Sequence, residues 1–136
     1  MQRKATYKIF VTRREQIWVG DEPDHCLMLT SMEGEPVNYT PGVAGEFLMR
    51  RSVNFHDRRK GAGPMQGYAI TTFQNGSVYS RFEGNRDGVT KMTAGTWTTY
   101  QGSGVLKNIK GKGKFTVKPT DSPNEFILDM EGDYEL

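Results

Sequence analysis

The chain has 136 residues, and its 18 basic and 16 acidic side chains give a formal charge of +2 at pH 7. This even balance argues against a nucleic-acid partner, and no apolar run reaches the roughly 18 residues that a membrane-spanning helix needs. Glycine is abundant at 16 residues while alanine and leucine are scarce, which excludes a helical bundle or a coiled coil. The length fits a single domain, residues 1–136, with one hydrophobic core.

Glycine, proline and asparagine residues divide the chain into eight short segments with the alternating pattern of β-strands. A glycine-bounded connection, residues 102–113, is expected to contain one helical turn at 105–109. Eight antiparallel strands in one domain favour a closed all-β barrel, and a β-sandwich is the alternative. The strands are predicted at residues 5–19, 25–33, 46–56, 67–73, 77–83, 91–100, 114–118 and 124–134.

Two dipeptides indicate which side chains face the barrel interior. Asn75-Gly76 and Asp87-Gly88 are typical of two-residue hairpin turns, which fix the register of the strands on either side. The outer face of these hairpins carries charged residues, so the opposite face is predicted to be inside. The predicted inner residues are Ala69, Thr71, Phe73, Val78, Ser80, Phe82, Thr93, Gly95, Trp97, Thr99, Phe126, Leu128, Met130 and Tyr134.

Charged residues share a face with apolar ones on two of the predicted strands. On the third strand Arg51 alternates with Phe47, Met49, Val53 and Phe55, and on the first strand Arg13 and Glu15 continue the face of Tyr7, Ile9 and Val11. An unpaired buried charge is costly, so an Arg51–Glu15 pair is predicted inside the cavity near Trp97. The alternative is that a β-bulge shifts the register, or that these residues lie at the barrel mouth.

The second half of the chain also resembles a known family. The runs 67–77 (GYAITTFQNGS), 95–104 (GTWTTYQGSG) and 111–115 (GKGKF) resemble a bacterial family of unknown function in the allene oxide cyclase barrel-like group, which includes dirigent proteins. The resemblance implies an eight-stranded barrel with a hydrophobic cavity, often in dimers or trimers, and cyclases or guides for reactive apolar intermediates. It also implies Glu15 and Pro23 as candidate catalytic residues.

Metal and nucleophile chemistry find little support in the sequence. His25 and Cys26 are neighbours on one predicted strand, so they face opposite sides of the sheet and cannot bind one ion together. Cys26 is interpreted as a buried structural thiol. Gly102-Ser103-Gly104 lacks the third glycine and the βαβ unit of a dinucleotide site. No metal and no cofactor are therefore expected.

The sequence favours a barrel that binds a small hydrophobic molecule without changing it, because no acid–base pair is evident. The alternative is a cyclase or isomerase that acts on a reactive apolar intermediate without a cofactor. A structural role would follow if side chains filled the barrel. The candidate ligand-binding residues are Glu15, Met49, Arg51, Phe73, Phe82 and Trp97.

Assembly and compartment are predicted from the outer face and the chain's start. Aromatic and apolar residues on the outer face predict a homo-oligomer, a dimer before a trimer. The single cysteine and the absence of an apolar run at the N-terminus predict the cytoplasm, without a membrane partner. The outer-face residues are Tyr68, Ile70, Tyr79, Met92, Thr96 and Tyr100.

Overall fold

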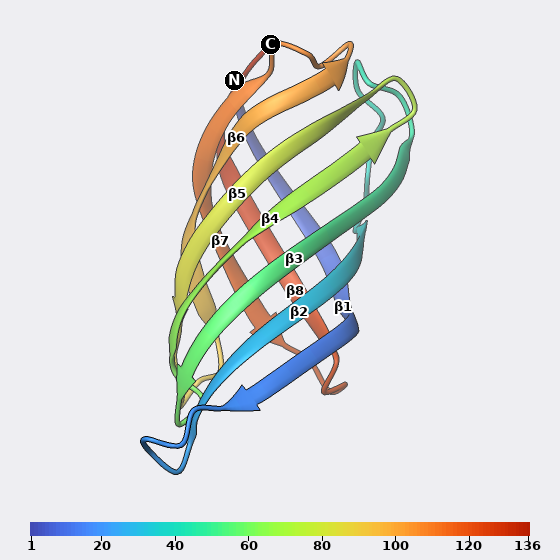
Figure 1. Ribbon diagram of the computed structural model, residues 1–136. Helices are drawn as coiled ribbons and strands as arrows, with labels where there is room; N and C mark the ends of the chain where they lie inside the picture. The colour runs from blue at the N-terminus through green and yellow to red at the C-terminus, as the bar shows by residue number, and fades with distance from the viewer.

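The computed structural model describes residues 1–136 and is a closed barrel of eight antiparallel strands, which confirms the predicted fold class. Each strand pairs with its neighbours in the sequence, and β1 pairs with β8 to close the barrel (Figure 1). The structure has no helix that is long and apolar enough to cross a lipid bilayer. The strands are β1 (Gln2–Trp18), β2 (His25–Pro36), β3 (Phe47–Arg59), β4 (Gly63–Phe73), β5 (Gly76–Arg86), β6 (Thr93–Gly104), β7 (Lys110–Pro119) and β8 (Glu125–Glu135).

The two ends of the barrel differ in what they contain. The chain termini lie side by side at one end (Figure 1), where the backbone N–H of Tyr134 donates to the carbonyl of Met1. We call this the terminal end, and it also contains the β2–β3, β4–β5 and β6–β7 connections. The opposite end contains the β1–β2, β3–β4, β5–β6 and β7–β8 connections. Closure leaves no sheet edge unpaired, because β1 and β8 pair with each other.

The hairpin registers differ from those predicted, but the inner faces are confirmed. The β4–β5 turn is at Gln74–Asn75, since Phe73 pairs with Gly76. A Cβ on Gly76 would lie 2.5 Å from the carbonyl oxygen of Ser103, so this glycine permits the approach of β6 instead of forming the turn. The β5–β6 connection is a loop of residues 87–92, not a two-residue turn. The β4–β5 shift is even throughout, and the β5–β6 shift is even up to the pair Ser80–Thr99, so the predicted inner residues keep their face. A further register shift lies between Tyr79 and Ser80 in the pairing with β6.

Residues 105–108 form hydrogen-bonded turns instead of the expected helical turn. The outward position predicted for Tyr68, Ile70 and Tyr100 is confirmed by their exposure. The homo-oligomer that this surface suggested remains a prediction.

Two β-bulges overturn the predicted facing of β1 and β3. The register shifts between Val11 and Arg13 where β1 pairs with β2, and between Phe47 and Met49 where β3 pairs with β4. A one-residue shift exchanges the two faces of a strand. Beyond the bulges, Arg13, Glu15, Met49, Arg51, Val53 and Phe55 are therefore exposed, while Arg50, Ser52, Asn54 and His56 are buried.

Trp97 belongs to the main apolar cluster and is 3% exposed. Its indole stacks on Tyr134 with ring centres 5.1 Å apart, and its Nε1 donates to the carbonyl of Lys114 over 3.1 Å. The indole lies over Gly113 and Gly132, which pair across β7 and β8. The cluster comprises Ile9, Met32, Met65, Trp97, Phe115 and Leu128.

We predict that Gly132→Val destabilises the barrel by about 1–3 kcal/mol through overpacking. A Cβ at this position would lie 2.6 Å from Trp97 Cζ2, within a rigid strand pair. Urea denaturation followed by tryptophan fluorescence measures the loss. Gly42→Val, in a connection where the nearest atoms to a Cβ are the flexible end of Arg3, is the control. Equal stability of the two variants would contradict the packing argument.

Candidate functional site

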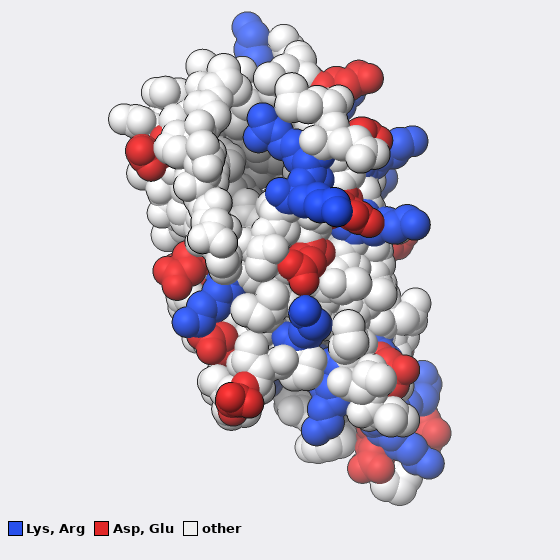
Figure 2. All heavy atoms as spheres, turned by 180° about the vertical axis from the view of Figure 1, so that it is seen from behind, with Lys and Arg blue, Asp and Glu red and all other residues white.

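The barrel encloses a cavity of about 680 Å³, a size typical of small-molecule sites. Most of its lining residues are apolar, and they come from all eight strands. Figure 2 shows a hollow in the surface with basic side chains beside it, and Arg3 and Lys4 are among the lining residues. The interior is not filled by side chains, so the packed barrel that would have indicated a structural role is excluded.

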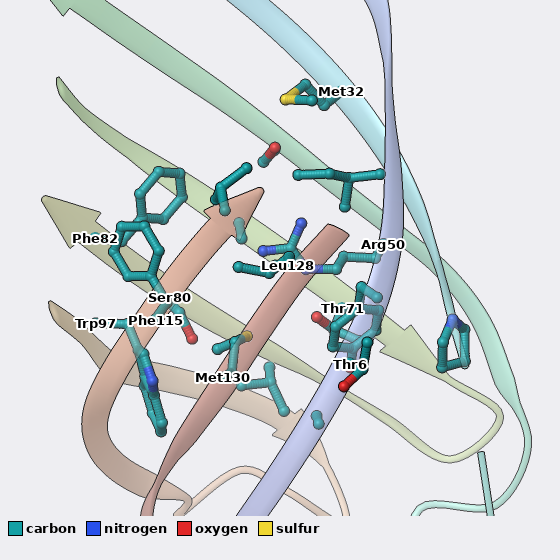
Figure 3. A pocket seen from close by; sticks show the side chains of 18 of the residues that line it. Thr6, Met32, Arg50, Thr71, Ser80, Phe82, Trp97, Phe115, Leu128 and Met130 are labelled. Carbon is teal, nitrogen blue, oxygen red and sulfur yellow. The ribbon is translucent and has the colours of Figure 1, made fainter. Parts of the chain in front are cut away.

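Aromatic and aliphatic side chains form one wall of the cavity (Figure 3). Phe82 and Phe115 meet edge to face with ring centres 5.7 Å apart, next to Trp97. Leu128 and Met130 of β8 extend this wall. Such a surface binds apolar ligand groups mainly through the hydrophobic effect.

Arg50 brings a positive charge into this apolar space. It follows the bulge in β3, is 5% exposed, and points into the cavity towards Leu128 (Figure 3). Its guanidinium carbon lies 5.3 Å from the centre of the Tyr7 ring, but the group forms no ion pair or hydrogen bond. Burial lowers the pKa of Arg50, yet a guanidinium stays protonated in proteins.

The nearby phenols do not neutralise Arg50. Burial raises the pKa of Tyr7. Burial, with a smaller contribution from Tyr7, raises the pKa of Tyr134 to about 12. Both phenols are therefore uncharged at neutral pH. The cavity contains a cation without a counterion.

Polar residues continue along the inner face of β3 towards the opposite end. Ser52, Asn54 and His56 are all buried and line the cavity. Burial, followed by the charges of Arg58, Arg86 and Arg14, lowers the pKa of His56 to about 4. The imidazole is therefore neutral at physiological pH.

His25 faces the outside of the barrel and is covered by the β1–β2 loop. Its Nδ1 lies 2.6 Å from Asp21 and its Nε2 lies 2.7 Å from Asp57, which raises the pKa of the imidazole. Asp21, Glu22 and His25 lie close enough together to hold a metal ion. Both imidazole nitrogens are already occupied, however, and Glu22 pairs with Arg59. The group is thus an ion-pair network that ties the loop to β3.

Cys26 is a buried free thiol, as predicted.

The structure places only some of the predicted site residues at the cavity. Phe73, Phe82 and Trp97 line it. The expected Arg51–Glu15 pair does not form, because the two bulges turn both residues outward and Glu15 pairs with Arg13. Met49, Arg51 and Glu15 are exposed on the outer surface, and Pro23 is exposed in the β1–β2 loop.

Sequence reasoning missed Arg50, although it stands next to Arg51. The apolar residues at odd positions of β3 indicated that the odd face was buried, but Met49, Val53 and Phe55 are exposed instead. The available clue was the polar series at even positions, Arg50, Ser52, Asn54 and His56. A ligand cavity, unlike a packed core, accommodates such a series.

The sequence matches no protein-family model, and no curated protein sequence matches it. Solved structures do resemble the barrel. A pyocyanin demethylase is 13% identical with a TM-score of 0.56, and the match covers 96% of this chain and 100% of the demethylase. AbnU, described as an exo-specific intermolecular Diels-Alderase, is 10% identical with a TM-score of 0.55, and 99% of each chain is covered. At these identities the similarity shows the fold alone.

We predict that His56 makes the protein more sensitive to acid. Its folded pKa of about 4 lies below the ordinary 6.5, so between these values the unfolded chain binds an extra proton. The stability that the neutral imidazole provides is complete above pH 6.5 and is lost as the pH falls towards 4. His56→Gln should therefore lose less stability than the wild type over this range, by about 3 kcal/mol.

Chemical denaturation at several pH values measures this difference. His25→Gln is the control, because the raised pKa of His25 places its effect above pH 6.5, where deprotonation removes its stabilising charge. Parallel stability curves for the wild type and His56→Gln between pH 4 and 6.5 would refute a neutral buried imidazole.

Proposed function

We propose that this barrel binds a small, mostly apolar molecule that carries an anionic oxygen, such as that of a carboxylate or an enolate, and that Arg50 donates hydrogen bonds to this oxygen. The observation that carries the proposal is the buried guanidinium without a counterion, in a cavity with largely apolar walls. The previously expected hydrophobic ligand thereby acquires a charged end.

The energetics of the cavity support an anionic ligand. A buried charge without a partner is costly, so Arg50 reduces the stability of the ligand-free barrel. A carboxylate would accept two parallel hydrogen bonds from the guanidinium and so compensate its charge, and such bonds are strong and directional. The apolar remainder of the ligand would cover Phe82, Phe115 and Trp97.

A second candidate function is a cyclase that folds a reactive substrate. It is supported by the two neighbours named for reactions on small molecules and by the resemblance to allene oxide cyclase-like proteins. Arg50 would donate hydrogen bonds to a carbonyl and stabilise negative charge that develops on it. A cycloaddition needs no proton transfer or cofactor, so this role does not require Glu15 or Pro23, which lie outside the cavity.

Two fluorescent probes with the same ring system test the role of Arg50. Anilinonaphthalene sulfonate carries a negative charge, and phenylnaphthylamine is its neutral counterpart. We expect Arg50→Met to weaken binding of the sulfonate at least about tenfold, because a charge-assisted hydrogen bond is lost. Binding of phenylnaphthylamine should be retained.

The neighbouring Arg51 provides the matched control. Arg51→Met removes an equal charge from the same strand but from the outer face, so both probes should bind it as they bind the wild type. Arg50→Met should be at least as stable as the wild type, since it replaces an unpaired buried charge by an apolar side chain. An equal loss for both probes, or no loss for the sulfonate, would overturn the proposal.

The same variant separates binding from cyclisation. A conjugated polyene acid that cyclises slowly in water is mixed with the protein and followed by absorbance. Faster cyclisation that depends on Arg50 favours the cyclase, whereas binding of the acid without a change in rate favours the binding protein.

A further inference from the structure

A second cluster of positive charge lies at the opposite end of the cavity from the termini. Arg14 and Arg58 line this part of the cavity, next to the neutral imidazole of His56. Arg86 lies close enough to Arg58 to affect its titration. The burial of Arg58 lowers its pKa to about 10, and the positive charges of Arg86 and Arg14 contribute to this shift. No carboxylate pairs with these three arginines, and Asp57, between His56 and Arg58 in the chain, faces His25 on the outside.

Buried polar atoms without partners mark the same place. Asn54 is 6% exposed and His56 is 7% exposed. The Oδ1 of Asn54, the Nδ1 of His56 and the Nε of Arg58 are all buried and form no hydrogen bond. The amide nitrogen of Asn54 reaches only the sulfur of Met32, at 3.5 Å. Buried polar groups in proteins are nearly always hydrogen-bonded, so a set of unpartnered groups calls for an explanation.

We infer that Asn54, His56 and Arg58 form a second subsite, which binds a second acidic group of the same ligand. This inference rests on the proposed function, because it places the first acidic group at Arg50. Arg58 supplies positive charge, while the neutral imidazole of His56 and the side-chain amide of Asn54 provide both hydrogen-bond donors and hydrogen-bond acceptors. Arg14 and Arg86 add to the positive potential without a compensating acid.

The spacing of the two subsites describes the ligand. Arg50 and His56 are six residues apart on β3, which corresponds to about 20 Å of strand. Met28 and Met65, which pair with His56 on the adjacent strands, and Met32 are apolar side chains along this path. The geometry therefore fits an elongated molecule with an apolar middle and an acidic group at each end. Flexible thioether side chains suit such a middle segment.

Straight-chain dicarboxylates and monocarboxylates of equal length test the inference. Dodecanoate, tetradecanoate and hexadecanoate, each with its α,ω-dicarboxylate, are titrated into the protein by calorimetry. We expect one of the dicarboxylates to bind at least about tenfold more tightly than the matching monocarboxylate. This expected preference exceeds the roughly twofold gain that a dicarboxylate would have merely because either of its two ends can bind at Arg50.

Variants assign the preference to the two subsites. Arg58→Met and Arg50→Met should each reduce the affinity for the dicarboxylate to that for the monocarboxylate. Arg58→Lys, which keeps the charge, should retain part of the preference, and Arg51→Met should retain all of it. Asn54→Leu is a second variant of the subsite, and it should weaken binding of the dicarboxylate more than binding of the monocarboxylate.

The outcomes distinguish this inference from the proposed function. If no dicarboxylate is preferred at any length, or if Arg58→Met and Asn54→Leu keep the preference, the second subsite is refuted and the cluster is a solvated mouth of the barrel. The proposed function then still stands, provided that Arg50→Met impairs the sulfonate probe. If Arg50→Met leaves the sulfonate probe unaffected, the proposed function itself fails.

Discussion

The single extra residues in β1 and β3 determine which side chains face the cavity, because neighbouring residues of a strand point to opposite faces. Without the bulge near Phe47, the inner face of β3 would carry the apolar Met49, Val53 and Phe55 together with Arg51. With it, the inner face carries Arg50, Asn54 and His56. The polar lining that β3 gives the cavity, with its unpartnered atoms, follows from this local change of register.

The same shift moves apolar side chains to the outside. Val53 and Phe55 of β3 are exposed next to Leu29 of β2 and Tyr68 of β4, their partners in the sheet. Such an arrangement does not favour the stability of an isolated barrel, because polar groups are buried while apolar ones meet water. Proteins accept local losses of stability where a binding site requires them. The inverted β3 is thus more readily explained by function than by folding.

The sequence correctly predicted which side chains point into the barrel on some strands but not on β3, and the difference has a physical reason. On β5 and β6 the hairpin registers were wrong by an even number of residues, so Ser80, Phe82 and Trp97 still pointed inward. On β3 the error was a single residue, and it exchanged Arg51 for Arg50. The bulge in β3 left no break in the apolar alternation, because Phe47, Met49 and Val53 stay at odd positions on both sides of it. Its position depends on pairing with distant strands.

A buried cation alone does not decide between binding and catalysis. A guanidinium that holds a carboxylate also stabilises charge that develops on a carbonyl, and only stronger binding of the transition state than of the substrate accelerates a reaction. One fold also supports many chemistries, so the neighbours' reactions leave the question open. The second cluster supplies a further argument. A ligand held at Arg50 and at Arg58 is stretched along the barrel, whereas an intramolecular cyclisation requires its chain to fold back on itself. Arg50 and Arg58 are eight residues apart on β3, which corresponds to about 26 Å of strand, and this separation favours binding over intramolecular cyclisation.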